Sequence, residues 1–298
     1  MSEAYPHLHA SARPLAEESP ELRIRRIRTD RWIAYARAEA ALSAMGDFLS
    51  FPKRLRMPNL LLVGPTNNGK TMIIDKFRRD HPPIEASTTR EGVANIPVLK
   101  VQMPSAPDER RFFGTILDAL GVPDRPNDRI ATKQDVAVRL MRATKVRLLI
   151  IDEVHNVLSG ARNQQRRFLN LLRWLGNELQ IPLVAVGTAE ALRAVQSDDQ
   201  LANRFEPFAL PPWRDGEEYR RLLSTLEAIL PLRRPSRLAE PAMAGKILSA
   251  AEGILGEIVA VVARAAVQAV TTEAEAVSAE MIDGTGFIPP SKRRRVAI

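Results

Sequence analysis

The sequence contains no cysteine, only four histidines and 5% aromatic residues in 298 positions. The absence of cysteine excludes disulfide bonds and cysteine-ligated zinc, and four scattered histidines argue against a histidine-rich metal site. The most apolar stretch, residues 258–270, contains Arg264 and Gln268 and is shorter than the roughly 20 residues that cross a bilayer, so we expect a buried helix and no membrane partner. The N-terminus does not have the basic start and following apolar block of a secretory signal, and we therefore expect a cytoplasmic protein.

Positive charge is in excess, with 43 Lys and Arg against 35 Asp and Glu, which gives a formal charge of +8. Each phosphate that Lys or Arg neutralises releases a counterion, so this balance favours a polyanionic partner such as nucleic acid. Many basic proteins bind no nucleic acid, and the charge alone does not decide.

Apolar segments alternate with helical patterns through the middle of the chain. Five such segments read as strands: 59–64, 96–103, 146–152, 181–187 and 205–210. Near-continuous apolar strands separated by helices predict an α/β fold, with a five-stranded parallel sheet between helices. Between the third and fourth strands a helical stripe is expected in the core: Phe168, Leu171, Leu172, Leu175 and Leu179.

Four regions follow from the composition. Residues 1–55 form an N-terminal extension, of which 1–20 are expected to be ordered only by a partner and 21–49 to be helical. Residues 56–212 form the α/β core, which ends at the Pro211-Pro212 turn. Residues 213–283 contain only helical segments, at 215–230, 239–251, 255–270 and 277–283, and residues 284–298 are a basic tail.

The segment GPTNNGKT, residues 64–71, follows the first predicted strand and precedes a helical pattern. Glycines let the backbone wrap around phosphates, the Lys70 ammonium reaches the β and γ phosphates, and the Thr71 hydroxyl ligates Mg²⁺. An ordinary glycine-rich turn is the alternative. The predicted cradle for nucleotide and Mg²⁺ comprises Gly64, Pro65, Thr66, Asn67, Asn68, Gly69, Lys70, Thr71 and Met72.

Two carboxylates, Asp152 and Glu153, end the third strand. A phosphate loop needs such a partner, because Asp152 would hold Mg²⁺ through its water shell and Glu153 would orient and deprotonate the attacking water. By themselves they could equally be a solvated strand end.

Thr188 and Arg204 complete the candidate set. Thr188 ends the fourth strand, where its hydroxyl could contact the γ-phosphate or the water, or could cap the next helix. Arg204 precedes the fifth strand and could reach the nucleotide of a neighbouring subunit as a trans-acting finger, or form a surface salt bridge.

Together these motifs resemble the AAA+ ATPases: GPTNNGKT, LLIIDEVH, VGT, NRF before the fifth strand, and a helical lid. More narrowly, the chain resembles the TniB group of bacterial transposition proteins, related to TnsC, through IIDEVHNVLSG, RFLNLLRWLGNELQIPLVAVGTAEA and LANRFEPFALPPW. The resemblance covers about residues 20–283. It departs from many AAA+ proteins at the start of a late lid helix, where an arginine is common and this chain has GILGE with Glu257.

The resemblance implies an ATP-dependent regulator of DNA transposition that assembles on double-stranded target DNA as a ring or helical filament. Such a protein recruits or activates a DDE transposase and works with a target-selection adaptor. It implies ATP and Mg²⁺ as cofactors, Lys70, Glu153, Thr188 and Arg204 as catalytic residues, and Thr71 and Asp152 at the metal.

DNA-contacting residues have no clear motif. Candidates are residues 110–112 and 162–167, which could equally be solvated helix faces, and the basic segments 22–28 and 292–295. Other functions share the same motifs: a helicase, a clamp-loader-like or initiator ATPase, or a nucleotide-gated scaffold that hardly hydrolyses ATP. A helicase is disfavoured because the chain has room for one nucleotide-binding core.

Overall fold

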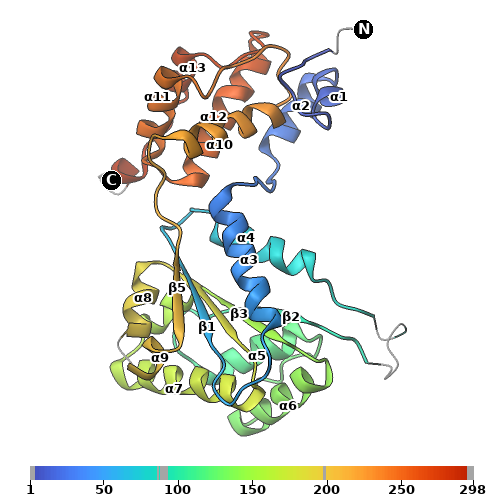
Figure 1. The fold of residues 1–298 in the computed structure, drawn as a ribbon, viewed down its shortest axis with the longest axis vertical. Coiled ribbons are helices and arrows are strands. Elements are labelled where there is room, and N and C mark those ends of the chain that lie inside the picture. Colours follow the sequence, from blue (N-terminus) through green and yellow to red (C-terminus); the bar gives the residue numbers. More distant parts are fainter. Residues whose placement is uncertain (1–3, 86, 88–92, 197–198, 294–298) are drawn as a thin grey trace. The chain divides into compact units, whose positions relative to one another are not determined.

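The computed structural model describes residues 4–85, 87, 93–196 and 199–293, and contains a sheet of five parallel strands (Figure 1). Its strand order is β2-β3-β4-β1-β5, and all neighbours are parallel. The strands are β1 (Asn59–Val63), β2 (Val98–Gln102), β3 (Leu148–Asp152), β4 (Leu183–Gly187) and β5 (Phe205–Ala209). Each lies within its predicted segment, which confirms the predicted α/β class with a five-stranded parallel sheet.

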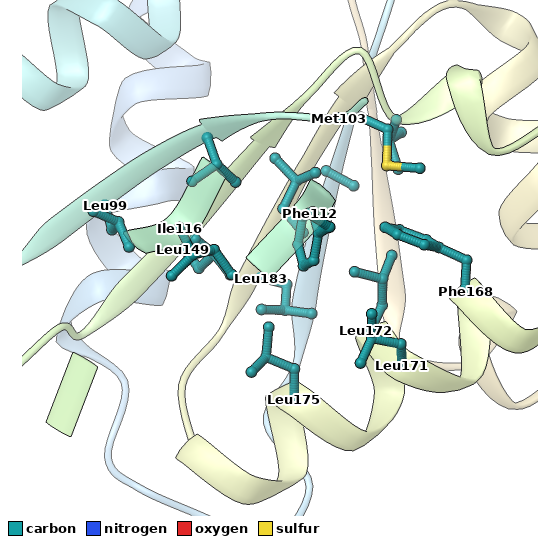
Figure 2. Close-up of a cluster of buried hydrophobic side chains, with 14 of the residues drawn as sticks. Leu99, Met103, Phe112, Ile116, Leu149, Phe168, Leu171, Leu172, Leu175 and Leu183 are labelled. Carbon is teal, nitrogen blue, oxygen red and sulfur yellow. The ribbon is translucent and has the colours of Figure 1, made fainter. Parts of the chain in front are cut away.

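Alternate strand residues point to opposite faces of this sheet. On one face, Leu99, Leu149 and Leu183 pack with Phe112 and Phe168 in one buried cluster (Figure 2). The predicted stripe of the helix between the third and fourth strands belongs to the same cluster, so that prediction is confirmed. The helical elements around the sheet are α3 (Ala36–Ser50), α4 (Lys70–Asp80), α5 (Glu109–Ala119), α6 (Ile130–Ala143), the 3₁₀-helix η2 (Val154–Ser159), α7 (Arg162–Leu179), α8 (Ala189–Gln196) and α9 (Asp199–Ala202).

Strand β5 is an edge strand that pairs with β1. Leu210 N donates to Val63 O at 2.7 Å, so the nitrogens of even-numbered residues of this strand point to β1 and the nitrogen of Pro207 faces the open side. Proline has no N–H and is tolerated in a sheet at such a position. Arg37 Nε donates to Ala209 O at 2.9 Å, and its guanidinium lies 4.2 Å from the centre of the Phe208 ring.

Two compact units divide the chain. The sheet unit contains residues 37–65 and 70–210, and the second unit, here called the lid unit, contains residues 1–36, 66–69 and 211–298. The helices of the lid unit are α1 (Arg13–Ala16), α2 (Pro20–Arg28), α10 (Glu217–Ile229), α11 (Pro241–Ala251), α12 (Leu255–Thr271), α13 (Ala279–Gly284) and α14 (Pro290–Arg293). Helices α2, α10, α11, α12 and α13 surround a core in which Ile27 of α2 packs with Leu223 of α10 and Ile258 of α12.

The N-terminal residues are part of this packing. The expectation that residues 1–20 need a partner for order is wrong for residues 4–20, because Leu8, Ala12 and Ala16 form a buried cluster and His9 N donates to Ala228 O at 2.8 Å. The predicted helix over 21–49 is two helices, α2 and α3, because the segment between them runs extended where Ile33 and Tyr35 pack into the lid core. The predicted extension 1–55 is therefore shared between the two units.

Within the described part of the chain, no single helix has both the length and the apolar character to cross a membrane. Helices α11 and α12 pass that test only as a pair, and they are bent by 117° relative to each other.

Candidate nucleotide-binding site

The loop 64–69 connects the carboxyl end of β1 to α4, whose first residue is Lys70. An ideal Cβ on Gly64 would lie 2.7 Å from Leu210 O, so only glycine lets the two segments approach this closely. Asn67 and Gly69 have φ values of 60° and 81°, in the left-handed region that favours glycine and asparagine. Glycine is therefore required at position 64 by the close approach of Leu210 O, and is favoured at position 69 by the left-handed backbone conformation.

Lys70 is 6% exposed, and its Nζ donates to Gly64 O at 3.0 Å and to Pro65 O at 2.6 Å. Burial lowers the pKa of the ammonium, and the carboxylates of Glu153 and Asp152 partly offset this. The side chain therefore folds back over its own loop, and its charge lies against the loop carbonyls.

The Thr71 hydroxyl donates to Asp152 Oδ2 at 3.2 Å, so the structure brings the two predicted metal residues together. Hydroxyl and carboxylate oxygens are the ligands that Mg²⁺ accepts in such sites, and the pair fits this ion. No group of three or more potential metal-ligating side chains was found among the described residues, so Mg²⁺ here would share its shell with phosphate oxygens and water. Met72 follows in the first turn of α4 and is half-buried.

Lys100 was missed by the sequence reasoning. Its Nζ lies 2.7 Å from Asp75 Oδ1 and 3.9 Å from Asp152 Oδ2, so a cation from β2 links α4 to the Asp152 carboxylate. The available signal was a single lysine inside the apolar strand segment PVLKVQM. A charge inside a buried strand needs a partner, and here the partner belongs to the candidate site.

Glu153 has φ 58° and ψ 35°, and its amide donates to Asp152 Oδ1 at 2.9 Å. A left-handed conformation in a residue other than glycine costs about 1–3 kcal/mol and is concentrated at functional sites. Its Oε2 lies 3.1 Å from His155 Nε2, and the Glu153 side chain is 37% exposed. The carboxylate can therefore accept a proton from solvent-derived water, with His155 as an orienting partner that the sequence reasoning missed.

Thr188 directly follows β4, which lies between β3 and β1. Its Oγ1 is buried and has no hydrogen-bond partner among the described residues. The helix-cap alternative needs this oxygen to accept a backbone N–H, and the described residues supply no such bond. Parallel strands end on the same edge, so Thr188 lies on the edge that carries Gly64 and Asp152.

Arg204 lies at the opposite edge. Asn59 N donates to Arg204 O at 2.8 Å, so Arg204 is beside the amino end of β1, whereas Gly64 follows its carboxyl end. Five strand residues at about 3.3 Å each separate the two ends by roughly 17 Å. Nη1 of Arg204 donates to Asn177 Oδ1 at 2.8 Å, and no carboxylate of the described residues pairs with it, so the salt-bridge alternative is not found.

Two further arginines, Arg54 and Arg56, line a pocket of about 540 Å³ with Arg204. Burial lowers the pKa of the Arg204 guanidinium, and the charges of Arg56 and Arg173 add to this effect. Among the described residues, no acidic side chain lines this pocket. A concave surface with three cations suits an anion such as phosphate.

In the lid unit, the tip of the phosphate loop is bonded to the start of α12. Gly256 N donates to Asn67 O at 2.9 Å, and Leu255 N donates to Asn68 Oδ1 at 3.1 Å. An ideal Cβ on Gly256 would lie 2.2 Å from Asn67 Oδ1, so a side chain at this position would require the Asn67 side chain to move. The next residue is Glu257, so the first turn of this helix carries a carboxylate where many AAA+ proteins have an arginine.

The two candidate DNA segments near the sheet are neighbours. Ser159 Oγ donates to Ser105 O at 2.7 Å, which joins the loops that precede α7 and α5. Arg162, Arg166 and Arg167 are exposed and form no ion pair with any described residue. In the other segment, Phe112 is a core residue, which leaves only Arg110 and Arg111 for contacts. Residues 294–295 of the basic tail lie outside the described residues.

Comparison with solved structures defines the class of the fold. The ORC1 protein of Aeropyrum pernix, solved in complex with DNA, has a TM-score of 0.59 at 17% identity, over 88% of this chain and 68% of that chain. The ORC2 protein of the same organism, solved as ADPNP and ADP complexes, has a TM-score of 0.57 at 16% identity, over 92% of this chain and 74% of that chain. A Walker-type ATPase of Pyrococcus abyssi has a TM-score of 0.53 at 14% identity, over 88% of this chain and 77% of that chain. The chain has the fold of an AAA+ P-loop NTPase.

The sequence profile of the family described as Bacterial TniB protein matches residues 23–215, more than half of the chain. The chain therefore belongs to the TniB family, as its motifs predicted. A search of curated proteins gave no match to this sequence.

Proposed function

We propose that this protein is an ATP-dependent, DNA-binding regulator of DNA transposition that assembles on target DNA and recruits or activates a DDE transposase. The observation that carries the proposal is the placement of two half-sites on one sheet. Lys70, Thr71, Asp152 and Glu153 lie at its carboxyl edge, and Arg204 lies roughly 17 Å away at its amino edge. Because Arg204 cannot reach the phosphate loop of its own chain, the Arg204 of a second copy completes the ATP site.

Each residue has a distinct task in ATP hydrolysis. Lys70 would leave the carbonyl oxygens of Gly64 and Pro65 for the β and γ phosphates, and Thr71 and Asp152 would hold Mg²⁺. When held by Thr71 and Asp152, Mg²⁺ would supply positive charge beside the phosphates. Glu153 accepts the proton of a water whose oxygen bonds to the γ-phosphorus as the bond to the ADP oxygen breaks.

Thr188 and Arg204 act on charge and position. The Thr188 hydroxyl, which has no partner among the described residues, can donate to the γ-phosphate or to the attacking water. Arg204 of a neighbouring copy would stabilise the charge of the transferring phosphoryl group, with Arg54 and Arg56 around it.

Duplex DNA is the surface proposed for assembly. The net charge of +8 favours a polyanion, and the exposed arginines at the start of α7 lie beside the loop before α5. These residues belong to the sheet unit and leave the lid unit available for other partners.

A second candidate function is a nucleotide-gated DNA scaffold with little hydrolysis. It is favoured by one observation: the first turn of α12, which is bonded to the phosphate loop, carries Glu257 and no arginine. The two candidates share ATP binding and assembly and differ in the turnover of ATP.

Sedimentation with duplex DNA and DNA-dependent ATPase measurements test the proposal on the full chain. We expect ATP-dependent assembly in the wild type, its loss in Lys70→Ala, and longer-lived complexes in Glu153→Gln. Lys76→Ala is a matched control, because Lys76 is on the same helix and pairs with Asp80 at the surface. Failure of the wild type to bind nucleotide would contradict the proposal. Assembly on DNA with negligible ATP turnover would favour the nucleotide-gated scaffold.

The role in transposition needs a separate readout. We expect a gene for a DDE transposase to lie beside this one. We also expect the Glu153→Gln complex on DNA to retain that transposase and to stimulate its strand transfer. Equal strand transfer with and without this protein would contradict a regulatory role.

A further inference from the structure

Glu257 is a buried carboxylate that the proposed reaction does not use. It lies in the first turn of α12 and is 6% exposed, and its Oε1 accepts a hydrogen bond from Asn67 Nδ2 at 3.0 Å. Asn67 belongs to the phosphate loop, so a negative charge lies against the loop that is expected to receive phosphates. Like charges in a partly desolvated site repel strongly, and this placement requires compensation.

The neighbouring helix amides do not supply that compensation. Gly256 N and Leu255 N, at the start of α12, donate to Asn67 O and to Asn68 Oδ1. A helix N-terminus is otherwise a good place for an anion, but here these two amides hold the loop itself. The approach is tight, because an ideal Cβ at position 256 would lie 2.2 Å from Asn67 Oδ1.

Arg293, in the C-terminal helix α14, supplies the missing charge. Its Nη1 and Nη2 donate to Glu257 Oε1 and Oε2 at 3.1 and 2.5 Å, a two-point pair with the whole carboxylate. Burial acts to raise the pKa of Glu257, but the hydrogen bonds from Arg293 and Asn67 outweigh it, and the pKa is lowered. The carboxylate is therefore ionised and neutralised by a residue 36 positions later in the chain.

Arg293 is held in place by its own surroundings. Its Nε donates to Ile288 O at 2.8 Å, and its guanidinium lies 4.9 Å from the centre of the Phe287 ring. Arg264 approaches the same ring at 5.4 Å. Also in α14, Ser291 N donates to Glu252 Oε2 at 3.1 Å, which anchors the segment to the end of α11.

We propose that Arg293 is a positioning residue for nucleotide binding: by neutralising Glu257 against Asn67, it sets the affinity of the phosphate loop for nucleotide. This rests on the proposed ATP-binding function. Without Arg293 the loop would keep its fold but carry an uncompensated negative charge beside the bound phosphates. The effect acts on binding, because neither Glu257 nor Arg293 is among the residues assigned to water activation.

Binding of a fluorescent ATP analogue to the full chain tests this inference. We expect Arg293→Ala to weaken binding on the order of tenfold, since one uncompensated charge near the phosphates repels them. Arg293→Lys keeps the charge and should weaken binding far less. The double variant Arg293→Ala, Glu257→Gln removes both charges and should regain near wild-type affinity.

Rescue separates this role from loss of structure. Ser291→Ala removes the hydrogen bond that Ser291 Oγ donates to Glu252 Oε1, a side-chain anchor of the same segment, without changing the charge at Glu257. Thermal unfolding of every variant identifies those that fold poorly. Equal affinity of Arg293→Ala and wild type, or no gain from Glu257→Gln in the Arg293→Ala background, would overturn the inference and leave the proposed function intact. A wild type that binds no nucleotide would overturn both.

Discussion

Arg204 offers the sharpest prediction, because its position forbids it from serving its own phosphate loop. Arg204 and the phosphate loop lie beside opposite ends of β1, roughly 17 Å apart. An extended arginine side chain is shorter than this distance. We therefore expect Arg204→Ala to lower ATP turnover by about 10³-fold or more, as removal of an arginine finger does, with nucleotide binding retained.

Mixing variants tests whether the arginine acts between copies. Arg204→Ala lacks the donated group and Glu153→Gln lacks the acceptor of the water proton, so each should be nearly inactive alone. In an equal mixture, about a quarter of the neighbouring pairs join an intact Glu153 site to an intact Arg204, and turnover should rise to roughly a quarter of wild type.

The assay is steady-state ATP turnover with duplex DNA, measured over a range of mixing ratios. Arg142→Ala, which breaks an exposed pair with Glu178 on the sheet unit, should behave as wild type. If the mixture showed only the sum of two inactive proteins while both variants bound nucleotide and assembled, the trans-acting assignment of Arg204 would be wrong.

Three other outcomes are expected. Arg166→Ala and Arg167→Ala should each lower the slope of log affinity for duplex DNA against log salt by about one, because one phosphate fewer is neutralised, and unchanged slopes would remove α7 from the interface. Thr188→Val should reduce ATP turnover roughly a hundredfold with unchanged nucleotide affinity and no drop in thermal stability, because the buried hydroxyl has no hydrogen-bond partner among the described residues. Arg23→Ala should cost about 3–5 kcal/mol of lid-unit stability, measured by denaturant unfolding, since it leaves the Glu275 carboxylate without its cation. Burial acts to raise the pKa of Glu275, but the hydrogen bonds from Arg23 and from the Arg233 amide outweigh burial and lower this pKa. The stability that the pair contributes is therefore present above pH 4.5, the ordinary pKa of the carboxyl, and is lost as pH falls through the pKa of the folded state.

The sheet was predictable because its signals are local. Five apolar runs and a helical stripe that begins with Phe168 report burial directly, and the phosphate loop is a contiguous motif. Thr71 and Asp152 could be paired from sequence because each ends or follows a strand of a parallel sheet, and such ends share an edge.

What the sequence concealed depends on packing between distant segments. Lys100 gains its meaning only when β2 lies beside β3, and Arg293 only when the C-terminal segment meets α12. The interruption after α2 was also invisible, because extended residues there are fixed by packing of Ile33 in the lid core and not by a turn motif. Neither charge nor periodicity carries that information.

The open side of β5 limits how copies of this protein can join. An exposed strand edge normally recruits a further strand through its free N–H and C=O groups. Here Pro207 offers no donor on that side and Arg37 occupies the carbonyl of Ala209, so a continuous intermolecular sheet at this edge is blocked. Any self-association at β5 must then rely on side-chain contacts, which can be made and released without unravelling the sheet.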